Sequence, residues 1–162
     1  MAATLVLVRV DDRLIHGQVT VAWGAWLEPD RIVLVNDEVA GTPWRRDLYA
    51  GSDTLGAAVS VVGVDEFCAA ARDDWWDGER IVVVVESPAD LLRLVECGLA
   101  VPSANVGGMH FSPGKRELVP YVFVNDRDVA DLRAVVRHGV RLEAQDVPQS
   151  VPVDLAPLLE RA

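Results

Sequence analysis

The segment Ile81–Val85, with the sequence IVVVV, constrains the fold of this chain more than any other. Branched residues favour strands, and this run has no polar residue on either of the two faces that a strand presents. A strand that is apolar on both faces must be covered on both faces, as happens in a parallel sheet between layers of helices. The run therefore predicts an α/β fold.

Other strand-like runs alternate with helical patterns along the chain. The predicted strands are Thr4–Val10, Arg31–Asn36, Val59–Val64, Arg80–Glu86, Ser103–Val106, Tyr121–Val124 and Val140–Ala144. The predicted helices are Gly17–Leu27, Pro43–Ala50, Asp65–Arg72, Ser87–Cys97 and Asp126–Arg137. This alternation predicts a three-layer, doubly wound domain with a mostly parallel sheet of about seven strands and helices on both faces. The last strand is free to run antiparallel at an edge.

The length of 162 residues predicts a single domain, which we place at residues 1–147. Three prolines interrupt the remaining residues 148–162. Within this tail, Asp154–Arg161 is compatible with a short helix or with a loosely held extension.

Charge and motif content exclude several classes of function. The chain has 15 basic and 25 acidic residues, and a net charge of −10 opposes binding to nucleic acid and to anionic lipid. It contains neither GxGxxG nor GxxxxGK[ST], so we expect no nucleotide cofactor, and the cysteine spacing predicts no metal site. Cys68 and Cys97 stand alone and no signal peptide is evident. We therefore expect a soluble, cytoplasmic protein with both thiols buried and reduced.

Tryptophan positions raise two further expectations. Trp23 and Trp26 share the apolar face of the predicted helix Gly17–Leu27. The adjacent Trp75 and Trp76 lie in a polar segment that is typical of a surface loop. Either one of this pair covers the edge of the sheet, or the pair offers an aromatic contact to a partner.

The loop after the first predicted strand holds the densest set of reactive side chains. Arg9, Asp11, Asp12, Arg13 and His16 fall within eight residues. In an open α/β sheet, ligands bind beyond the carboxyl ends of the strands, where loops lead into helices. We therefore expect the functional site in this loop.

His16 directly precedes a predicted helix, where free N–H groups and the helix dipole favour an anion and disfavour an imidazolium. A neutral imidazole is a nucleophile that can carry a covalent phosphoryl group. Arg9 and Arg13 would neutralise the resulting dianion through charge-assisted hydrogen bonds. Alternatively, His16 only caps the helix or fills a polar gap, and the spacing alone leaves both interpretations open.

A second segment, NVGGMHFSPGK at residues 105–115, is a candidate wall of the same site. Gly107 and Gly108 allow a close backbone approach after a strand. His110 follows them and has either a phosphoryl role or a positioning or surface role. Gln18, early in the predicted helix, either donates to a phosphate or is simply solvated.

These motifs resemble a known family. RVDDRLIHGQV at residues 9–19, followed by AW and by DRIVLVNDEVA at residues 30–40, is similar to the amino-terminal signature of one component of the bacterial sugar phosphotransferase system. That component is enzyme IIB of the mannose/fructose/sorbose class. The segment 105–115 and VFVNDRDV at residues 122–129 fit the same family. The resemblance runs from about Val6 to Pro148.

The resemblance implies a cytoplasmic phosphocarrier. In this family the histidine of the loop, here His16, accepts a phosphoryl group on Nδ1 from a IIA protein. It then passes the group to a sugar held by the membrane components IIC and IID. Arg13 would neutralise the phosphoryl oxygens, and Asp11 or Asp12 would accept the remaining imidazole N–H. The further residues expected to contribute to binding are Arg9, Gln18, Gly107, Gly108 and His110.

Two other functions compete with this one. A regulatory module of the same fold would use His16 only as a sensor of phosphorylation. A small-ligand enzyme on a flavodoxin-like scaffold would require a cofactor loop, which the sequence lacks. The residues do not name the sugar, and a homodimer is the default expectation for the oligomeric state.

Overall fold

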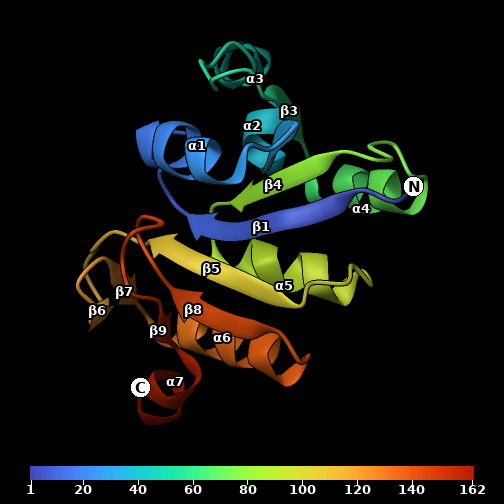
Figure 1. The fold of residues 1–162 in the computed structure, drawn as a ribbon. Coiled ribbons are helices and arrows are strands. Elements are labelled where there is room, and N and C mark those ends of the chain that lie inside the picture. Colours follow the sequence, from blue (N-terminus) through green and yellow to red (C-terminus); the bar gives the residue numbers. More distant parts are fainter.

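A seven-stranded sheet forms the centre of the computed structural model, which describes all 162 residues (Figure 1). The strands lie in the order β3-β2-β4-β1-β5-β8-β9, and every neighbouring pair is parallel except β8 and the edge strand β9. Their bounds are β1 (Thr4–Asp11), β2 (Arg31–Val35), β3 (Ala58–Val62), β4 (Arg80–Val85), β5 (Ser103–Gly108), β8 (Arg141–Ala144) and β9 (Val153–Asp154).

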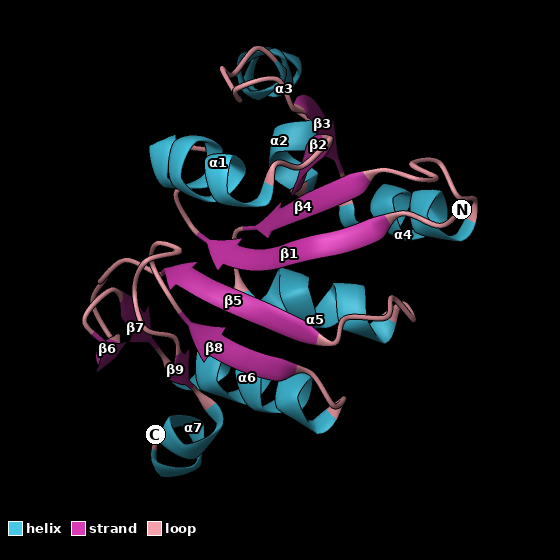
Figure 2. Ribbon diagram, viewed as in Figure 1, coloured by secondary structure: helices cyan, strands magenta, loops and turns pink.

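Helices pack on both faces of this sheet (Figure 2). One face carries α4 (Val64–Arg72), α5 (Pro88–Glu96), α6 (Asp126–Arg137) and α7 (Ala156–Arg161). The other carries the π-helix η1 (Gln18–Trp23), α1 (Gly24–Leu27) and α2 (Asp37–Ala40), while α3 (Pro43–Ala50) has no buried residue. The predicted three-layer, doubly wound α/β fold is confirmed.

The strand β4 shows why the fold follows from the sequence. Ile81, Val83 and Val85 belong to the core cluster formed with α4, α5 and α6. Val82 and Val84 belong to a second cluster, formed with η1 and α2. All five side chains are buried, so the apolar run lies between two layers of helices, as its composition predicted.

The membership of the sheet differs from the prediction. The predicted strand Tyr121–Val124 is β7 (Val122–Val124), which pairs with β6 (Arg116–Val119) in a separate antiparallel sheet. Only Pro120 and Tyr121 separate the two strands, so local hairpin pairing prevails over insertion into the main sheet. The seventh strand of the main sheet is β9 instead, from the tail.

The tail packs against the rest of the molecule. Leu155 and Leu159 are fully buried in the larger core cluster. The guanidinium of Arg133 in α6 donates to the carbonyl oxygen of Leu159. The residues beyond 148 therefore form the short helix that the sequence allowed, and they cover one edge of the sheet.

The π-helix changes which tryptophan faces the core. Trp23 is buried, but Trp26 is 65% exposed, so the expectation that they share an apolar face is wrong. A π-turn bonds residue i to residue i+5, and the residues beyond it rotate away from the 3.6-residue period. Of the other tryptophans, Trp76 packs against Phe67 with ring centroids 5.5 Å apart, and Trp75 is exposed.

The expectation of two reduced thiols is also wrong, because a disulfide joins Cys68 of α4 to Cys97 at the end of α5. These helices pack side by side on one face, which brings the two Cα atoms to 6.3 Å. Lone cysteines in a sequence give no such distance. Cys68 itself is buried, as expected.

Reduction of this disulfide is expected to lower stability without unfolding the protein. The bond closes a loop across 29 residues, and in the chain-entropy model a loop of that length stabilises the fold by about 3.6 kcal/mol. For a domain of this size the melting temperature should then fall by roughly 7–14 °C in reductant. Thermal melts with and without reductant measure this shift. The Cys68→Ser/Cys97→Ser protein should melt at the reduced value and show no response to reductant; an identical melt for wild type in both conditions would contradict the prediction.

Candidate functional site

The site lies where the connections of the sheet diverge. After β1 the chain crosses to β2 on one side, and after β5 it crosses to β8 on the other side. Because β1 and β5 are neighbours, a crevice opens between their carboxyl ends. The two predicted segments meet there, with the backbone N–H of Asp12 donating to the carbonyl oxygen of Gly108 at 3.1 Å.

Arg9 lies beneath this crevice and is completely buried. Its Nε and Nη2 atoms donate to Oδ2 of Asp11 at 3.3 and 3.2 Å. Its Nη1 atom donates to Oδ1 of Asn105 at 2.6 Å and to the carbonyl oxygen of Gln145 at 2.9 Å, and Nη2 donates to the carbonyl oxygen of Asp146 at 2.9 Å. Burial lowers the pKa of Arg9, and the charge of Asp11 opposes that shift. Arg9 therefore faces protein groups rather than the open crevice, where the sequence placed it.

A glycine and a tryptophan enclose the guanidinium of Arg9. Gly107 lies so close that a Cβ atom built on it would be 1.8 Å from Cζ of Arg9. On another side the Trp23 ring centroid is 5.4 Å from Cζ, a cation–π distance, and Nε1 of Trp23 donates to the carbonyl oxygen of Asp146. Gly107 therefore leaves room for the side chain of Arg9. The sequence had suggested instead that this glycine allows the backbone to approach a ligand.

The Asp11 carboxylate is buried and shared by two arginines. Nε and Nη2 of Arg13 donate to its two oxygens, each at 2.9 Å, which is the bidentate geometry of a strong ion pair. This hydrogen bond is the main cause of a raised pKa for Arg13. Arg13 also donates to Oε1 of Gln18 at 2.8 Å, and its side chain keeps 31% exposure. Arg9 and Arg13 thus share one carboxylate, and the charges of Asp12 and Asp146 also act on Arg13.

His16 lies beside Asp11. Its Nε2 atom is buried, has no hydrogen-bond partner and is 3.7 Å from Oδ2 of Asp11. Its Nδ1 atom is 3.0 Å from the carbonyl oxygen of Leu14, and because a carbonyl only accepts, Nδ1 donates in this arrangement. Leu14 has a φ of 64°, an uncommon left-handed conformation for a side chain of this size. The strained residue thus directs its carbonyl group at the imidazole.

Asp12 faces a different histidine. Its Oδ1 atom is 2.6 Å from Nδ1 of His110, and its Oδ2 atom accepts from the backbone N–H of His110 at 2.7 Å. The sequence left open which of Asp11 and Asp12 lies beside His16. The structure places Asp11 beside His16 and Asp12 on His110.

A cleft of about 330 Å³ opens beside these groups. Five of the predicted residues line it: Arg13, Gln18, Gly107, Gly108 and His110. The other four, Arg9, Asp11, Asp12 and His16, are not in the lining. Sequence reasoning missed two polar members, Tyr121 and Asp146. Burial is the main cause of a raised pKa for Tyr121, and the hydroxyl of Ser150 is the main cause of a lowered pKa for Asp146. Asp146 follows the carboxyl end of β8, a position at which parallel sheets hold ligands, so that rule could have identified it.

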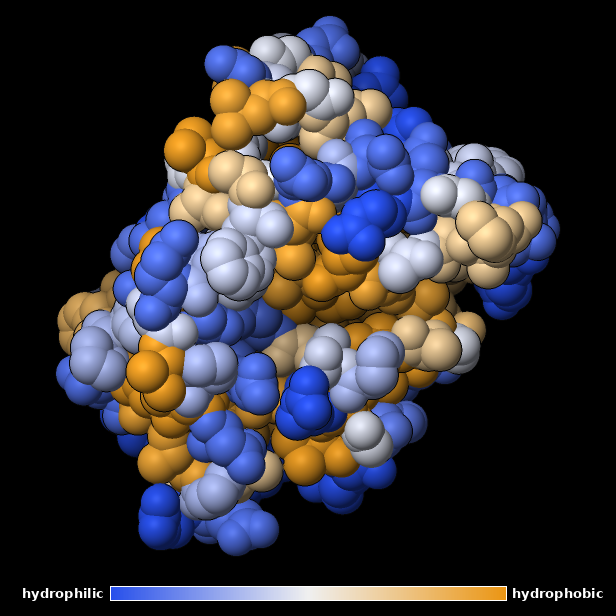
Figure 3. All heavy atoms as spheres, viewed as in Figure 1, coloured by the Kyte–Doolittle hydropathy of each residue, from blue (hydrophilic) through white to orange (hydrophobic).

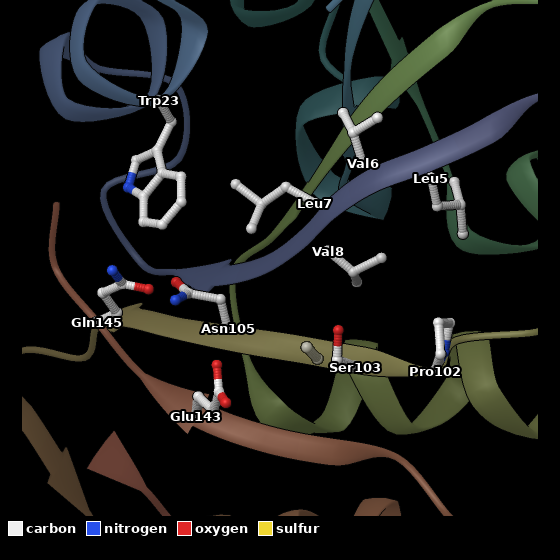
Figure 4. Close-up of a pocket in the computed structure, with 11 residues that line it drawn as sticks. Leu5, Val6, Leu7, Val8, Trp23, Pro102, Ser103, Asn105, Glu143 and Gln145 are labelled. Atoms are coloured by element: carbon white, nitrogen blue, oxygen red, sulfur yellow. The ribbon is translucent and has the colours of Figure 1, made fainter. Parts of the chain in front are cut away.

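A second hollow, of about 120 Å³, lies over β5 and β8. On this part of the sheet face no helix covers the strands (Figures 3 and 4). Trp23 lies at one end of the hollow, above Asn105 and Gln145, so residues that contact Arg9 form part of its lining.

No group of three or more His, Cys, Asp or Glu side chains is arranged to hold a metal ion. No helix has the length and apolar character needed to cross a membrane.

The family described as PTS system sorbose subfamily IIB component matches residues 5–162. The N-acetylgalactosamine-specific phosphotransferase enzyme IIB component 2 of Escherichia coli K12 is 36% identical over 159 residues, covering 96% of this chain and 98% of that protein. The mannose-specific EIIAB component of the same strain is 34% identical over 155 residues, covering 96% of this chain but 48% of that longer protein.

A solved structure gives the same result for the fold. The IIBSor domain of the sorbose permease from Klebsiella pneumoniae superposes with a TM-score of 0.90 at 31% identity. The superposition covers 100% of this chain and 98% of that one. Relatives named for three different sugars therefore match this chain at similar identity.

Proposed function

Because the chain belongs to the sorbose subfamily of phosphotransferase system IIB components, we propose that it is a phosphocarrier whose His16 takes a phosphoryl group from a IIA protein and passes it to a sugar during uptake. The membrane components IIC and IID would hold that sugar. The mannose-specific relative is named EIIAB, which supports a IIA protein as the donor. The relatives' different sugar names leave the sugar of this chain open.

The observation that carries this proposal is the single buried carboxylate that joins Arg13 to the surroundings of His16. Arg13 is partly exposed, so its planar guanidinium can move onto the oxygens of an incoming phosphoryl group. Asp11 stays in place meanwhile because Arg9 holds it from the interior.

The proton on the imidazole decides which nitrogen can attack. If Nδ1 is the acceptor, as the family resemblance implies, its hydrogen bond to Leu14 must break and the ring proton must reside on Nε2. Asp11, 3.7 Å from Nε2, is positioned to hold that proton after a small shift. An orienting carboxylate selects the tautomer of a catalytic histidine in this way elsewhere. The N–P bond of the donor then breaks as the new N–P bond forms, and no proton leaves the pair.

Incubation with a phosphorylated IIA protein carrying labelled phosphate tests the proposal. One acid-labile, base-stable phosphoryl group per chain is expected, because a P–N bond to imidazole has that stability. Addition of vesicles containing IIC and IID, with sugar, should then release the label as sugar phosphate. An unlabelled chain would contradict the carrier role, and a labelled chain that transfers nothing to sugar would favour the regulatory module.

Replacement of Arg13 by lysine is expected to slow phosphoryl acceptance roughly 10- to 100-fold. A point charge cannot reproduce two parallel hydrogen bonds, and one charge-assisted hydrogen bond contributes about 1.5–3 kcal/mol. The fold should persist, since Arg13 is at the surface of the cleft. The label transferred from phosphorylated IIA at short times measures the rate of acceptance, and a thermal melt shows whether the fold persists. Unchanged transfer would remove Arg13 from the site.

A further inference from the structure

The pair formed by Asp12 and His110 has no part in the acceptance of phosphate described above, yet it is the more firmly built of the two histidine sites. Asp12 holds the ring at Nδ1 and the backbone at N–H, at 2.6 and 2.7 Å. The ring orientation is therefore fixed from two points, although the side chain is 68% exposed. Two consecutive carboxylates thus serve two histidines, one each.

This contact determines which nitrogen of a neutral His110 is free. A carboxylate only accepts, so the proton of the neutral ring lies on Nδ1, and Nε2 keeps its lone pair. The structure gives Nε2 of His110 no partner. A histidine in the lining of a cleft whose Nδ1–H is held by an aspartate and whose Nε2 has no partner has the arrangement of a general base.

His110 lies where such a base would be useful. It lines the 330 Å³ cleft together with Arg13, the group proposed to hold the phosphoryl oxygens. The other titratable groups in that lining are Tyr121 and Asp146, and Asp12 is the charged group in direct contact. The cleft therefore brings together a cation for the phosphoryl group and an open imidazole nitrogen.

We propose that His110, oriented by Asp12, is the general base for the release of the phosphoryl group to sugar. This inference rests on the proposed function. Nε2 of His110 takes the proton of the attacking sugar hydroxyl as the new P–O bond forms and the P–N bond to His16 breaks. The electron pair of the P–N bond returns to the His16 ring. His110, now an imidazolium beside Asp12, loses its proton to solvent.

The two halves of the carrier cycle differ in their need for this base. Transfer from one histidine to another involves no hydroxyl, so acceptance from IIA requires no proton acceptor. Transfer to a sugar hydroxyl does require one, and general bases contribute typically 10²- to 10⁴-fold to such steps. A role in orienting the loop alone would affect both halves together.

The experiment measures both half-reactions of His110→Gln, which keeps a polar side chain but has no basic nitrogen. Acceptance of label from phosphorylated IIA is measured as the reference, and it should fall far less than transfer to sugar. Transfer to sugar, assayed with IIC and IID vesicles and with mannose, fructose, sorbose and N-acetylgalactosamine in turn, should fall about 100-fold or more.

Three further proteins separate catalysis from structure. Free imidazole should restore sugar transfer to His110→Ala, because it supplies the missing base without repairing a fold. Asp12→Asn should slow transfer about tenfold, since one amide donor would then face the backbone N–H of His110. His138→Gln is the matched control, because His138 is an exposed histidine at the end of α6, and both half-reactions should be unchanged.

The outcomes distinguish this inference from the function on which it rests. Transfer that is slowed far more than acceptance, and that free imidazole restores, supports His110 as the base. Equal loss in both half-reactions, or transfer at the wild-type rate, overturns it while leaving the carrier function intact. If wild type accepts no label at all, the proposed function fails and this inference fails with it.

Discussion

A His16→Ala protein is expected to take up no phosphoryl group from phosphorylated IIA. Alanine offers no nucleophile, and neither remaining histidine combines a neighbouring arginine pair with the buried carboxylate that faces His16. The loss should be at least 10³-fold, to the background of the assay, because a covalent carrier has no bypass. Acid-labile, base-stable label per chain is the quantity to measure, with a thermal melt to show that the fold persists.

Two other histidine variants serve as controls for this result. His110→Ala should still accept label on His16, because its expected role lies in the later half-reaction. His138→Ala should also resemble wild type, since its side chain is exposed at the end of α6. Full histidine labelling of His16→Ala, with loss of label in either control, would show that the site has been assigned to the wrong residue.

Gly107→Ala is expected to destabilise the protein by about 4 kcal/mol or more. A loss of that size prevents folding if the free energy of unfolding of the wild type is small. The added methyl carbon would lie 1.8 Å from Cζ of Arg9. Arg9 cannot move aside without breaking its hydrogen bonds to Asp11, Asn105 and the carbonyl groups of the loop after β8. Breaking a buried ion pair costs about 3–5 kcal/mol, to which overpacking adds about 1–3 kcal/mol.

Urea unfolding of Gly107→Ala measures this effect, and Gly17→Ala is its matched control. Gly17 adjoins His16 and has an ordinary helical φ of −54°, and no atom lies within 4 Å of the place that an added methyl carbon would take. Its replacement should change stability by less than about 1 kcal/mol. Equal midpoints for Gly107→Ala and wild type would mean that Arg9 is not held against Gly107.

The fold could be predicted because its evidence is local. The apolar run Ile81–Val85 requires cover on both faces, and the alternation of strands and helices supplies that cover. β9 was not predicted, because a strand of two residues is too short to show a periodic pattern. The exposure of Trp26 was not predicted either, because a π-turn changes the helical period and leaves no sign in the amino-acid composition. The disulfide depends on how α4 packs beside α5, which no spacing between cysteines reveals.

The site was predictable in its location and less so in its contacts. Strand ends in a parallel sheet meet at one edge, so the loop of His16 and the segment of Gly107 were expected together. The direction of the Arg9 side chain was not predictable, because its partners are as far as 136 and 137 residues away in sequence. The assignment of Asp11 and Asp12 to different histidines likewise depends on the position of His110, 98 residues beyond Asp12.

The anchoring of Arg9 also determines whether the motif could be transplanted. A peptide of residues 8–19, or the same stretch grafted onto a foreign strand and helix, would carry Arg9, Asp11, Arg13 and His16 in order. It would lack the Asn105 side chain and the two carbonyl groups that fix the guanidinium, and the gap that Gly107 leaves for it. Arg9 would then no longer be fixed beneath Asp11, and the carboxylate would turn toward solvent. A transplant that is to work must therefore import parts of β5 and of the turn after β8 as well, so this short signature is not a portable module.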